Sequence, residues 1–195
     1  MSKSSPAPSK ARHAAKLIYH AALNVPHRLL HGRRHRAGRL RLSRAPRPKN
    51  ILVVCYGNVC RSPYLQAVLQ RALPGTTVRS AGFFGSDRAV PELSIEIAGR
   101  RGIDLSHYRS RPLLPADVTG ADLIIVMDAE QEREILDRFT ITRARIMIAG
   151  DLDPNFASTR AIADPWNKPA HVFEESFDRL DRCAAALVSA LPPAT

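Results

Sequence analysis

Short apolar runs that alternate with amphipathic segments constrain the fold of this chain more than any other feature. Residues 51–54 (ILVV) and 121–128 (ADLIIVMD) have the length and apolar composition of buried strands. Two further strands are expected at residues 76–82 and 144–150. Because strands that alternate with helices form right-handed βαβ units, we predict an α/β fold with a four-stranded parallel sheet and helices on both faces.

The segments between and after these strands carry helical patterns. In residues 62–73, Ser62 is expected to cap the helix and Pro63 to lie in its first turn, while leucine and valine recur at helical spacing. Cys183 repeats with the apolar face of a long final helix, which places its thiol in the core. The other helices are predicted at residues 90–103, 129–139 and 171–191.

The positive charge of the chain is confined to its N-terminal quarter. Residues 1–49 hold 13 Lys and Arg and no acidic residue, which leaves 16 basic against 18 acidic residues in the remainder, a net charge of about −2. We therefore divide the chain into a basic, partly disordered and amphipathic extension, residues 1–49, and a folded domain, residues 50–195. Since no run of apolar residues approaches 18, no transmembrane helix is expected.

The basic extension admits several interpretations. Residues 11–31 show helical spacing, and the acid-free, arginine-rich composition is shared with organelle transit peptides. Nucleic-acid binding is disfavoured because no RNA- or DNA-binding motif accompanies the charge. A solvated extension without function is a further alternative. The sharper hypothesis is a basic amphipathic segment, residues 11–48, that lies on an anionic membrane surface.

Two cysteines follow the first strand closely, in the segment VVCYGNVCRSPYLQAVLQ (residues 53–70). Three cysteines in 195 residues do not form a disulfide framework, and this favours a reducing, cytoplasmic compartment. A zinc site needs about four close ligands, and the next histidine along the chain, His107, is distant in sequence. A reversible disulfide between Cys55 and Cys60 remains open beside the third interpretation, a reactive thiolate.

The thiolate interpretation explains more of the segment. A tight loop between a strand and a helix directs backbone N–H groups inward and forms an anion cradle. Gly57 and Asn58 are the residues best able to adopt left-handed backbone angles there. Arg61 supplies a planar fork for two phosphate oxygens, and the same positive field favours the thiolate of Cys55, to which Ser62 can donate a hydrogen bond.

The loop VCYGNVCRSP resembles the signature V-C-x-G-N-x-C-R-S-P of the low-molecular-weight protein tyrosine phosphatases. This match is far more specific than a lone C-x5-R pattern. The resemblance continues in SAG, GIDLS, ADLIIVMD and ADPW and covers residues 50–190, leaving the extension outside. It implies a Rossmann-like phosphatase fold and phosphoryl transfer through a phosphocysteine intermediate.

The resemblance assigns roles to individual residues. Cys55 is the nucleophile, Arg61 holds the phosphoryl oxygens and Asp164 is the general acid and base. No metal or cofactor is implied, because Arg61 and the loop dipoles supply the positive charge. Asp153 precedes a proline as Asp164 does, and we expect it to form only a turn. The phosphate-binding loop is expected to comprise Tyr56, Gly57, Asn58, Val59, Cys60 and Ser62.

Residues outside the loop are expected to complete the site. Ser80 matches a residue of the family's loop-bracing network, and a histidine usually completes that network. Here strict spacing places Tyr108 at the histidine position and His107 one residue early, so both remain candidates. Trp166 is expected at the substrate rim, where it would stack on a phenyl ring, or alternatively at an edge of the core. Asn167 follows where some relatives carry a second aromatic.

The resemblance also leaves alternatives for the substrate. Arsenate reductases of this fold need additional cysteines, and residues 61–182 contain none. Protein arginine phosphatases carry threonine before the second loop cysteine, whereas Val59 matches the tyrosine-specific type. A non-enzymatic phosphate-binding module is disfavoured because all three catalytic groups are present.

The implied partners are phosphotyrosine proteins. Bacterial relatives often oppose tyrosine kinases of polysaccharide export, and such a kinase is a candidate partner. Cys60 is expected to act as a redox partner of Cys55 or, alternatively, as a small buried residue.

Overall fold

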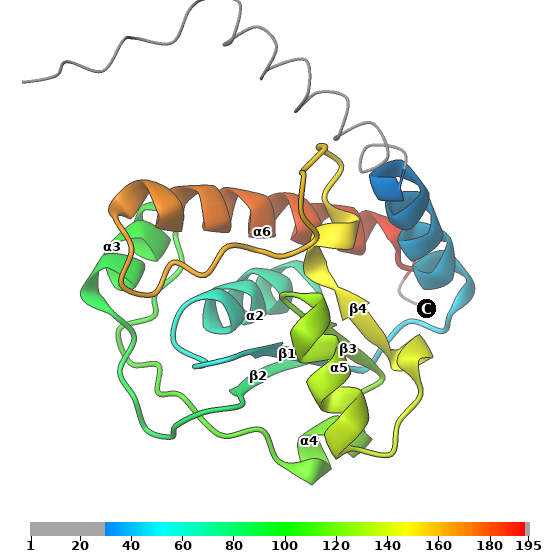
Figure 1. Cartoon of the computed structure of the whole chain (residues 1–195), viewed down its shortest axis with the longest axis horizontal. Helices are drawn as coiled ribbons and strands as arrows, with labels where there is room; N and C mark the ends of the chain where they lie inside the picture. The colour runs from blue at the N-terminus through cyan, green and yellow to red at the C-terminus, as the bar shows by residue number, and fades with distance from the viewer. Residues whose placement is uncertain (1–29, 194–195) are drawn as a thin grey trace, which may run out of the picture.

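The computed structural model of the chain describes residues 30–193 and contains the predicted four-stranded sheet (Figure 1). The strands are β1 (Asn50–Cys55), β2 (Thr77–Gly82), β3 (Leu123–Val126) and β4 (Ile146–Ile148), in the order β2-β1-β3-β4. Every pairing is parallel. The α/β fold class is thereby confirmed. Because the four strands are parallel, their carboxyl ends, where such folds bind ligands, all lie at one edge of the sheet.

Helices cover both faces of the sheet, as predicted. Val53 on β1 joins a core cluster with α2, α3 and α6, whereas its neighbour Val54 joins a cluster with α4 and α5. This alternation follows from the two-residue period of a strand that is buried on both faces. The helices are α2 (Arg61–Ala72), α3 (Glu92–Arg100), α4 (Pro115–Gly120), α5 (Ala129–Arg138) and α6 (Ala170–Ala190), with short 3-10 turns η1 (Arg143–Arg145) and η2 (Ala149–Leu152).

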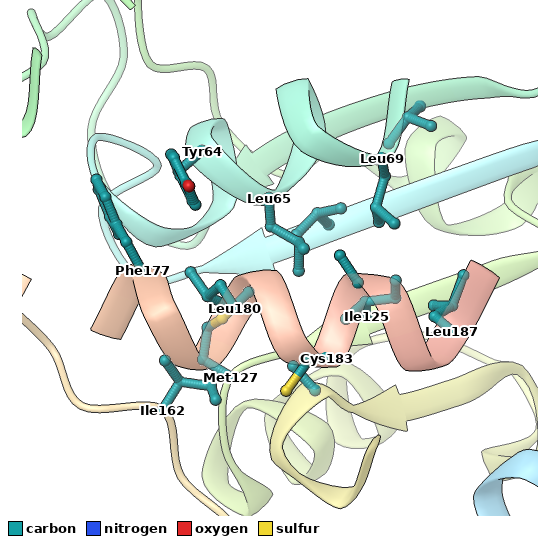
Figure 2. Close-up of a cluster of buried hydrophobic side chains, with 14 of the residues drawn as sticks. Tyr64, Leu65, Leu69, Ile125, Met127, Ile162, Phe177, Leu180, Cys183 and Leu187 are labelled. Atoms are coloured by element: carbon teal, nitrogen blue, oxygen red, sulfur yellow. The ribbon is translucent and has the colours of Figure 1, made fainter. Parts of the chain in front are cut away.

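The larger cluster lies between α2 and α6 (Figure 2). Tyr64 of α2 stacks on Phe177 of α6 with ring centroids 3.9 Å apart and planes 2° from parallel. Leu65, Leu180 and Cys183 are fully enclosed beside them, so the expectation that Cys183 lies in the core is confirmed. Because this packing fixes α2 at its first turns, it also fixes the loop between β1 and α2.

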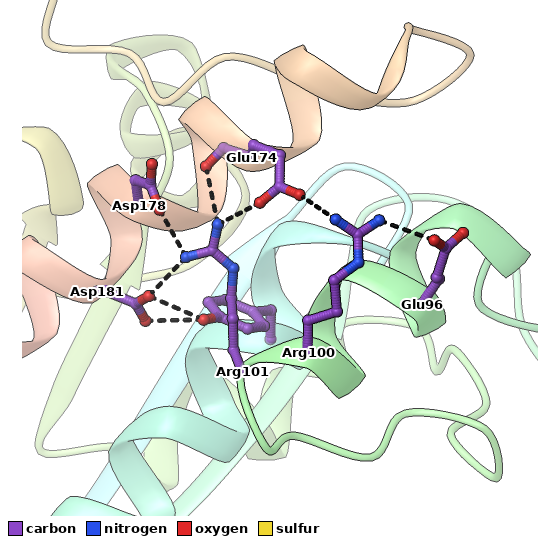
Figure 3. A network of polar contacts seen from close by, with 7 residues as sticks. Glu96, Arg100, Arg101, Glu174, Asp178 and Asp181 are labelled. Carbon is purple, nitrogen blue, oxygen red and sulfur yellow. Dashed lines mark hydrogen bonds and ion pairs between the residues drawn. The ribbon is translucent and has the colours of Figure 1, made fainter.

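An ion-pair network ties α3 to α6 on the outer side of this cluster (Figure 3). Arg101 donates to Glu174, Asp178 and Asp181, and Asp181 also accepts from the hydroxyl of Tyr64 at 2.8 Å. Exposed ion pairs contribute little individually, but this one is shared by several groups and reaches the buried tyrosine. The network therefore orients α6, whose apolar side chains form one side of the larger core cluster.

Residues 30–44 form a helix that packs against the domain, and we call this segment the docked helix (Figure 1). Leu42 is only 4 % exposed and belongs to the larger core cluster. Arg39 donates to Ser189 at 3.0 Å, and Arg41 donates to the carbonyl of Ile146 at 2.7 Å. This part of the basic extension therefore shares the core of the domain.

Two expectations for the local structure differ from the structure. Helix α2 begins at Arg61 after an N-cap at Cys60 that makes no side-chain cap hydrogen bond, so the prediction of Ser62 as the cap is wrong. The Ser62 hydroxyl instead contacts Cys55 and Asn58. Helix α4 was not anticipated, because Val118 is its one buried residue and six residues carry no helical period.

Parts of the extension lie outside the described residues, including most of the amphipathic segment expected at residues 11–31. Within residues 30–193, no helix combines the length and the apolar character that crossing a membrane requires.

Candidate active site

The loop between β1 and α2 lies at the carboxyl edge of the sheet. Cys55 is the last residue of β1 and Arg61 is the first residue of α2, and each is 3 % exposed. The short connection between them wraps around the Cys55 side chain. The position agrees with the general rule that parallel sheets bind ligands beyond the carboxyl ends of their strands.

The sulfur of Cys55 has two polar contacts, one with this loop and one with the first turn of α2. The backbone N–H of Asn58 donates to Sγ at 3.3 Å, and Ser62 Oγ lies 3.0 Å from the same sulfur. Both contacts stabilise negative charge on sulfur, as a nucleophilic thiolate requires. The Ser62 contact was expected from the sequence.

Asn58 is the central residue of the loop. Its φ of 51° lies in the left-handed region, as predicted, and its side chain is completely buried. Its amide Nδ2 donates to Ser62 Oγ and to Ser80 Oγ, both at 2.9 Å. The amide thus connects the residue that contacts Cys55 with a residue on β2, and it holds an unfavourable backbone angle in place.

Tyr108 completes this network and His107 does not. The Tyr108 hydroxyl donates to Asn58 Oδ1 at 2.9 Å and lies 2.7 Å from Ser80 Oγ, whereas His107 is exposed. Burial raises the pKa of Tyr108, although its hydrogen bonds with Ser80 and Asn58 oppose the shift. The hydroxyl of a neutral tyrosine thus takes the histidine position that the family resemblance suggested.

Two glycines at the loop lie at close approaches of neighbouring atoms. Gly57 does not adopt a positive φ, so that part of the sequence prediction is wrong. Instead, a β-carbon on Gly57 would lie 3.1 Å from Nη1 of Arg88. A β-carbon on Gly82, at the end of β2, would lie 2.7 Å from the carbonyl oxygen of Tyr56, so glycine there lets the strand approach the loop.

The guanidinium of Arg61 is directed into the site. Nη1 donates to the carbonyl of Ile162 at 3.1 Å, and Nη2 forms a short ion pair with Oδ2 of Asp164. Nε is buried and has no hydrogen-bond partner among the described residues. A buried N–H without a partner is costly, so this group favours an anion that binds beside it.

Asp164 and Asp153, the two Asp-Pro candidates, lie in different environments. The carboxylate of Asp164 accepts from Arg61 and from the backbone N–H of Trp166, and its side chain is 47 % exposed. Asp153 is buried between Arg179 and Arg182. Burial would raise the pKa of Asp153, but the hydrogen bond and charge of Arg182 outweigh it and lower the pKa, so Asp153 is a structural anion.

Arg179 also holds the segment that leads to Asp164. It donates to the carbonyl oxygens of Thr159 and Ala161, each at 2.7 Å. Ser176, one turn earlier on α6, donates to the carbonyl of Ala163 at 2.9 Å. Helix α6 therefore positions the carboxylate that faces Arg61.

These groups open into one small cavity of about 150 Å³. Trp166, 40 % exposed, and exposed Phe84 both line this cavity, and the rim role of Trp166 stays a prediction. Arg88 and Phe84 were not anticipated, although both lie in the loop that follows the carboxyl end of β2, where ligand contacts are common. The lining residues are Cys55, Tyr56, Gly57, Val59, Cys60, Arg61, Phe84, Arg88, Asp164 and Trp166.

Tyr56 is a half-buried residue of the loop. Its ring stacks on Phe84 with centroids 5.8 Å apart. Burial and the carboxylates of Asp128 and Glu130 raise the pKa of Tyr56, so its hydroxyl stays neutral. The ring supports the aromatic wall of the cavity mouth.

The remaining thiols differ from Cys55 in their surroundings. Burial, reinforced by the negative charge of neighbouring groups, raises the pKa of Cys60 to about 12. Burial raises the pKa of Cys183 to about 12 as well. All three cysteines are free, and the redox role of Cys60 stays a prediction. Within residues 30–193 there is no group of three His, Cys, Asp or Glu side chains arranged for a metal ion.

Comparison with known proteins agrees with this arrangement. The model of a family described as low molecular weight phosphotyrosine protein phosphatase matches residues 50–193. The probable low molecular weight protein-tyrosine-phosphatase EpsP of Ralstonia nicotianae is 38 % identical over 141 residues, which cover 72 % of this chain and 94 % of that protein.

Solved structures give the same result. Vibrio vulnificus Wzb in complex with benzylphosphonate superimposes with a TM-score of 0.67 at 30 % identity, over 74 % of this chain and 99 % of that one. The YwlE arginine phosphatase from Geobacillus stearothermophilus has a TM-score of 0.66 at 28 % identity, over 73 % and 92 % of the two chains. The chain described here therefore belongs to the low molecular weight phosphotyrosine protein phosphatase family.

Proposed function

We propose that this chain is a protein-tyrosine-phosphatase that hydrolyses phosphotyrosine through a phosphocysteine intermediate. One observation carries the proposal: the Cys55 thiol, the Arg61 guanidinium and the Asp164 carboxylate line a single cavity with an aromatic wall. These are a nucleophile, an anion clamp and a proton donor, the three groups that metal-free phosphoryl transfer needs.

In the first step, the thiolate of Cys55 attacks phosphorus and the bond from phosphorus to the tyrosine oxygen breaks. Arg61 and the loop N–H groups bind the equatorial oxygens, over which the charge of a loose transition state is spread. Asp164 gives its proton to the departing phenolate. The contacts of Ser62 and of the Asn58 N–H with sulfur lie where they can stabilise the attacking thiolate.

In the second step, water attacks the phosphocysteine. Asp164, now ionised, accepts a proton from that water, and the Cys55 thiolate leaves as inorganic phosphate forms. The thiolate is a good leaving group because the contacts that stabilised it before attack are still in place. The cycle returns Asp164 to its protonated form and needs no other reactant.

Phosphotyrosine is favoured over phosphoarginine by two features of the cavity. Trp166 and Phe84 form aromatic surfaces at the mouth, which suit a phenyl ring. Val59, rather than threonine, lines the floor beside Cys60. An arginine phosphatase of this fold is the alternative, and YwlE is named as one.

The function is tested by turnover on phosphotyrosine, phosphoarginine and arsenate in parallel. We expect phosphate release from phosphotyrosine but not from phosphoarginine, and we expect no arsenite from a reaction in which arsenate is offered with a thiol reductant. Comparable hydrolysis of phosphoarginine would transfer the assignment to that substrate. No turnover of any of the three would leave a phosphate-binding module as the better description.

The substrates would be phosphotyrosine proteins in the cytoplasm, and a bacterial tyrosine kinase of polysaccharide export is the candidate partner. The resemblance noted from the sequence supports this assignment, and the similarity to EpsP, which is named as a probable protein-tyrosine-phosphatase, supports phosphotyrosine as the substrate group. Release of phosphate from an autophosphorylated kinase of this type, compared with an unrelated phosphotyrosine protein, is the direct measurement.

We also infer that the basic extension, residues 11–48, holds the protein at an anionic membrane surface. The docked helix presents Arg33, Arg36 and Arg44 to solvent on one arc. Leu30 and Leu40, which are 40 % and 46 % exposed, lie on the same arc. Basic residues interleaved with exposed leucines are the composition of an interfacial helix.

The membrane inference predicts that charge reversal of this arc weakens vesicle binding. Each basic residue near an anionic surface contributes about 1 kcal/mol, so the triple variant R33E/R36E/R44E should bind phosphatidylcholine–phosphatidylserine vesicles roughly 100-fold more weakly. Co-sedimentation of the full-length chain measures this affinity. Point variants are preferable to deletion of the extension, because deletion would also remove the buried Leu42.

The matched control reverses three exposed arginines of the catalytic domain, Arg71, Arg79 and Arg133. It changes the net charge equally and should leave vesicle affinity within a few-fold of the native value. Equal losses in both variants would indicate attraction by net charge alone. Unchanged binding by the R33E/R36E/R44E variant would contradict the inference.

A further inference from the structure

A second arginine lines the mouth of the active-site cavity, and the proposed chemistry does not use it. Arg88 lies in the loop between β2 and α3, half-buried, beside Asp164 and Trp166. Among residues 30–193, no ion pair joins its guanidinium to a carboxylate. A charged side chain held at the mouth of a cavity and left unpaired by a carboxylate is a candidate ligand contact.

The Arg88 side chain is held in position from three sides. Its Cζ lies over the ring of Trp166, 4.7 Å from the ring centroid. Nη1 packs against Gly57, where a β-carbon would approach within 3.1 Å, and Cδ packs against Gly85, where a β-carbon would approach within 2.8 Å. Both glycines thus make room for one side chain.

The backbone of Arg88 is fixed as well. Its N–H donates to Ser110 Oγ at 3.0 Å, and its carbonyl accepts from the Ser110 N–H at 3.0 Å. Ser110 is itself buried. The loop that carries the guanidinium is therefore anchored to the segment that follows Tyr108, so little backbone freedom of this loop remains to be lost on binding.

The two arginines lie at different depths. Arg61 is buried at the floor beside Cys55, whereas the neighbours of Arg88 at the mouth, Phe84 and Trp166, are 56 % and 40 % exposed. A phosphoryl group that reaches Cys55 is bound by Arg61. Arg88 then faces the part of the substrate that remains outside the floor, which in a phosphoprotein includes the residues beside the phosphotyrosine.

We propose that Arg88 binds an anionic group that flanks the phosphotyrosine, so that the enzyme selects acidic phosphopeptides. Stacking on Trp166 occupies one face of the guanidinium and leaves N–H edges for a carboxylate or a phosphate. The inference rests on the proposed phosphotyrosine phosphatase function and adds a specificity-determining residue to it. The anion can come from glutamate or aspartate, or from a neighbouring phosphorylated residue.

The test compares phosphotyrosine peptides that differ only at the two positions beside the phosphotyrosine, which carry Glu, Gln or phosphoserine. At low salt, kcat/KM should be about three- to tenfold higher for the Glu peptide than for the Gln peptide. In R88Q the ratio should fall to about 1, whatever happens to the absolute rates. R88K keeps the charge but loses the planar fork, so its ratio should be intermediate.

A matched variant separates this effect from net charge. Arg79 is an exposed arginine on β2 that does not line the cavity, and R79Q removes the same charge. Its Glu-to-Gln ratio should equal that of the native protein. The role of Arg88 is overturned if the Glu-to-Gln ratio of kcat/KM persists in R88Q. It is also overturned if this ratio falls as much in R79Q as in R88Q.

A binding measurement independent of turnover is available, because Trp166 is the only tryptophan in the chain. In the inactive C55S background, intrinsic fluorescence should report tighter binding of the Glu peptide than of the Gln peptide, and C55S/R88Q should not distinguish them. A phosphoserine peptide that binds better than the Glu peptide, again only with Arg88, identifies phosphate as the preferred anion.

The outcomes distinguish this inference from the proposed function. If the native protein hydrolyses none of the peptides, the proposed function fails. If it hydrolyses Glu and Gln peptides with equal kcat/KM, the function stands and the inference about Arg88 is wrong. Raising the salt concentration should reduce the ratio, since a partly exposed ion pair is screened.

Discussion

Replacement of Cys55 by serine is expected to abolish phosphotyrosine hydrolysis, lowering kcat on the order of 10⁴-fold or more. Serine fits the same site and can keep the contacts with Ser62 and Asn58. However, its hydroxyl stays protonated at neutral pH and cannot attack phosphorus as the thiolate does. Phosphate release from a phosphotyrosine peptide measures the loss, and mass spectrometry of the quenched native enzyme should show phosphate on Cys55.

Cys183→Ala is the control for the Cys55 variant. Cys183 is a buried thiol on α6, and burial keeps it protonated. Its removal should lower stability slightly and leave kcat within a few-fold of the native value. Retention of substantial turnover by C55S would remove Cys55 from its assigned role, whatever the control shows.

Replacement of Asp164 by asparagine is expected to slow the hydrolysis of aryl phosphates roughly 10²- to 10⁴-fold when the leaving group is a poor one. Asparagine can still accept from the N–H of Trp166, so the turn is retained, but it cannot supply a proton. The loss should shrink for phenols that leave readily as anions. A plot of log kcat against the leaving-group pKa should therefore be steeper for D164N than for the native enzyme.

Two further measurements complete the Asp164 test. D164N should still be inhibited by inorganic phosphate, because Arg61 and the loop remain. D137N removes an exposed carboxylate of α5 and should leave the slope of the plot unchanged. Identical slopes for D164N and the native enzyme would show that another group donates the proton.

The sheet and the thiol loop were predictable because their signals are local. The apolar runs at residues 51–54 and 121–128 are strands in the structure, and the positive φ of Asn58 follows from residue type. The Cys55–Ser62 contact likewise joins two residues that are only seven positions apart in the sequence. Short-range chemistry of this kind is encoded in consecutive residues.

Contacts between segments distant in the sequence were harder to predict. The choice of Tyr108 over His107 depends on which side chain points toward Ser80 and Asn58, and a one-residue ambiguity in spacing cannot decide it. Arg88 approaches Gly57 and Trp166 only after three separate loops have packed. The packing of the docked helix against the domain was not predicted, because a single buried leucine, Leu42, does not show which surface it contacts.

The tyrosine at position 108 makes the brace of the catalytic loop indifferent to acidification. A histidine there would gain a proton near pH 6.5, and its hydrogen bonds would rearrange within the physiological range. The pKa of Tyr108 is raised, so this hydroxyl keeps its proton from acidic to mildly alkaline pH. Asn58 and Ser80 thus meet the same neutral partner throughout, and any acid limb of the pH–rate profile belongs to the reacting groups.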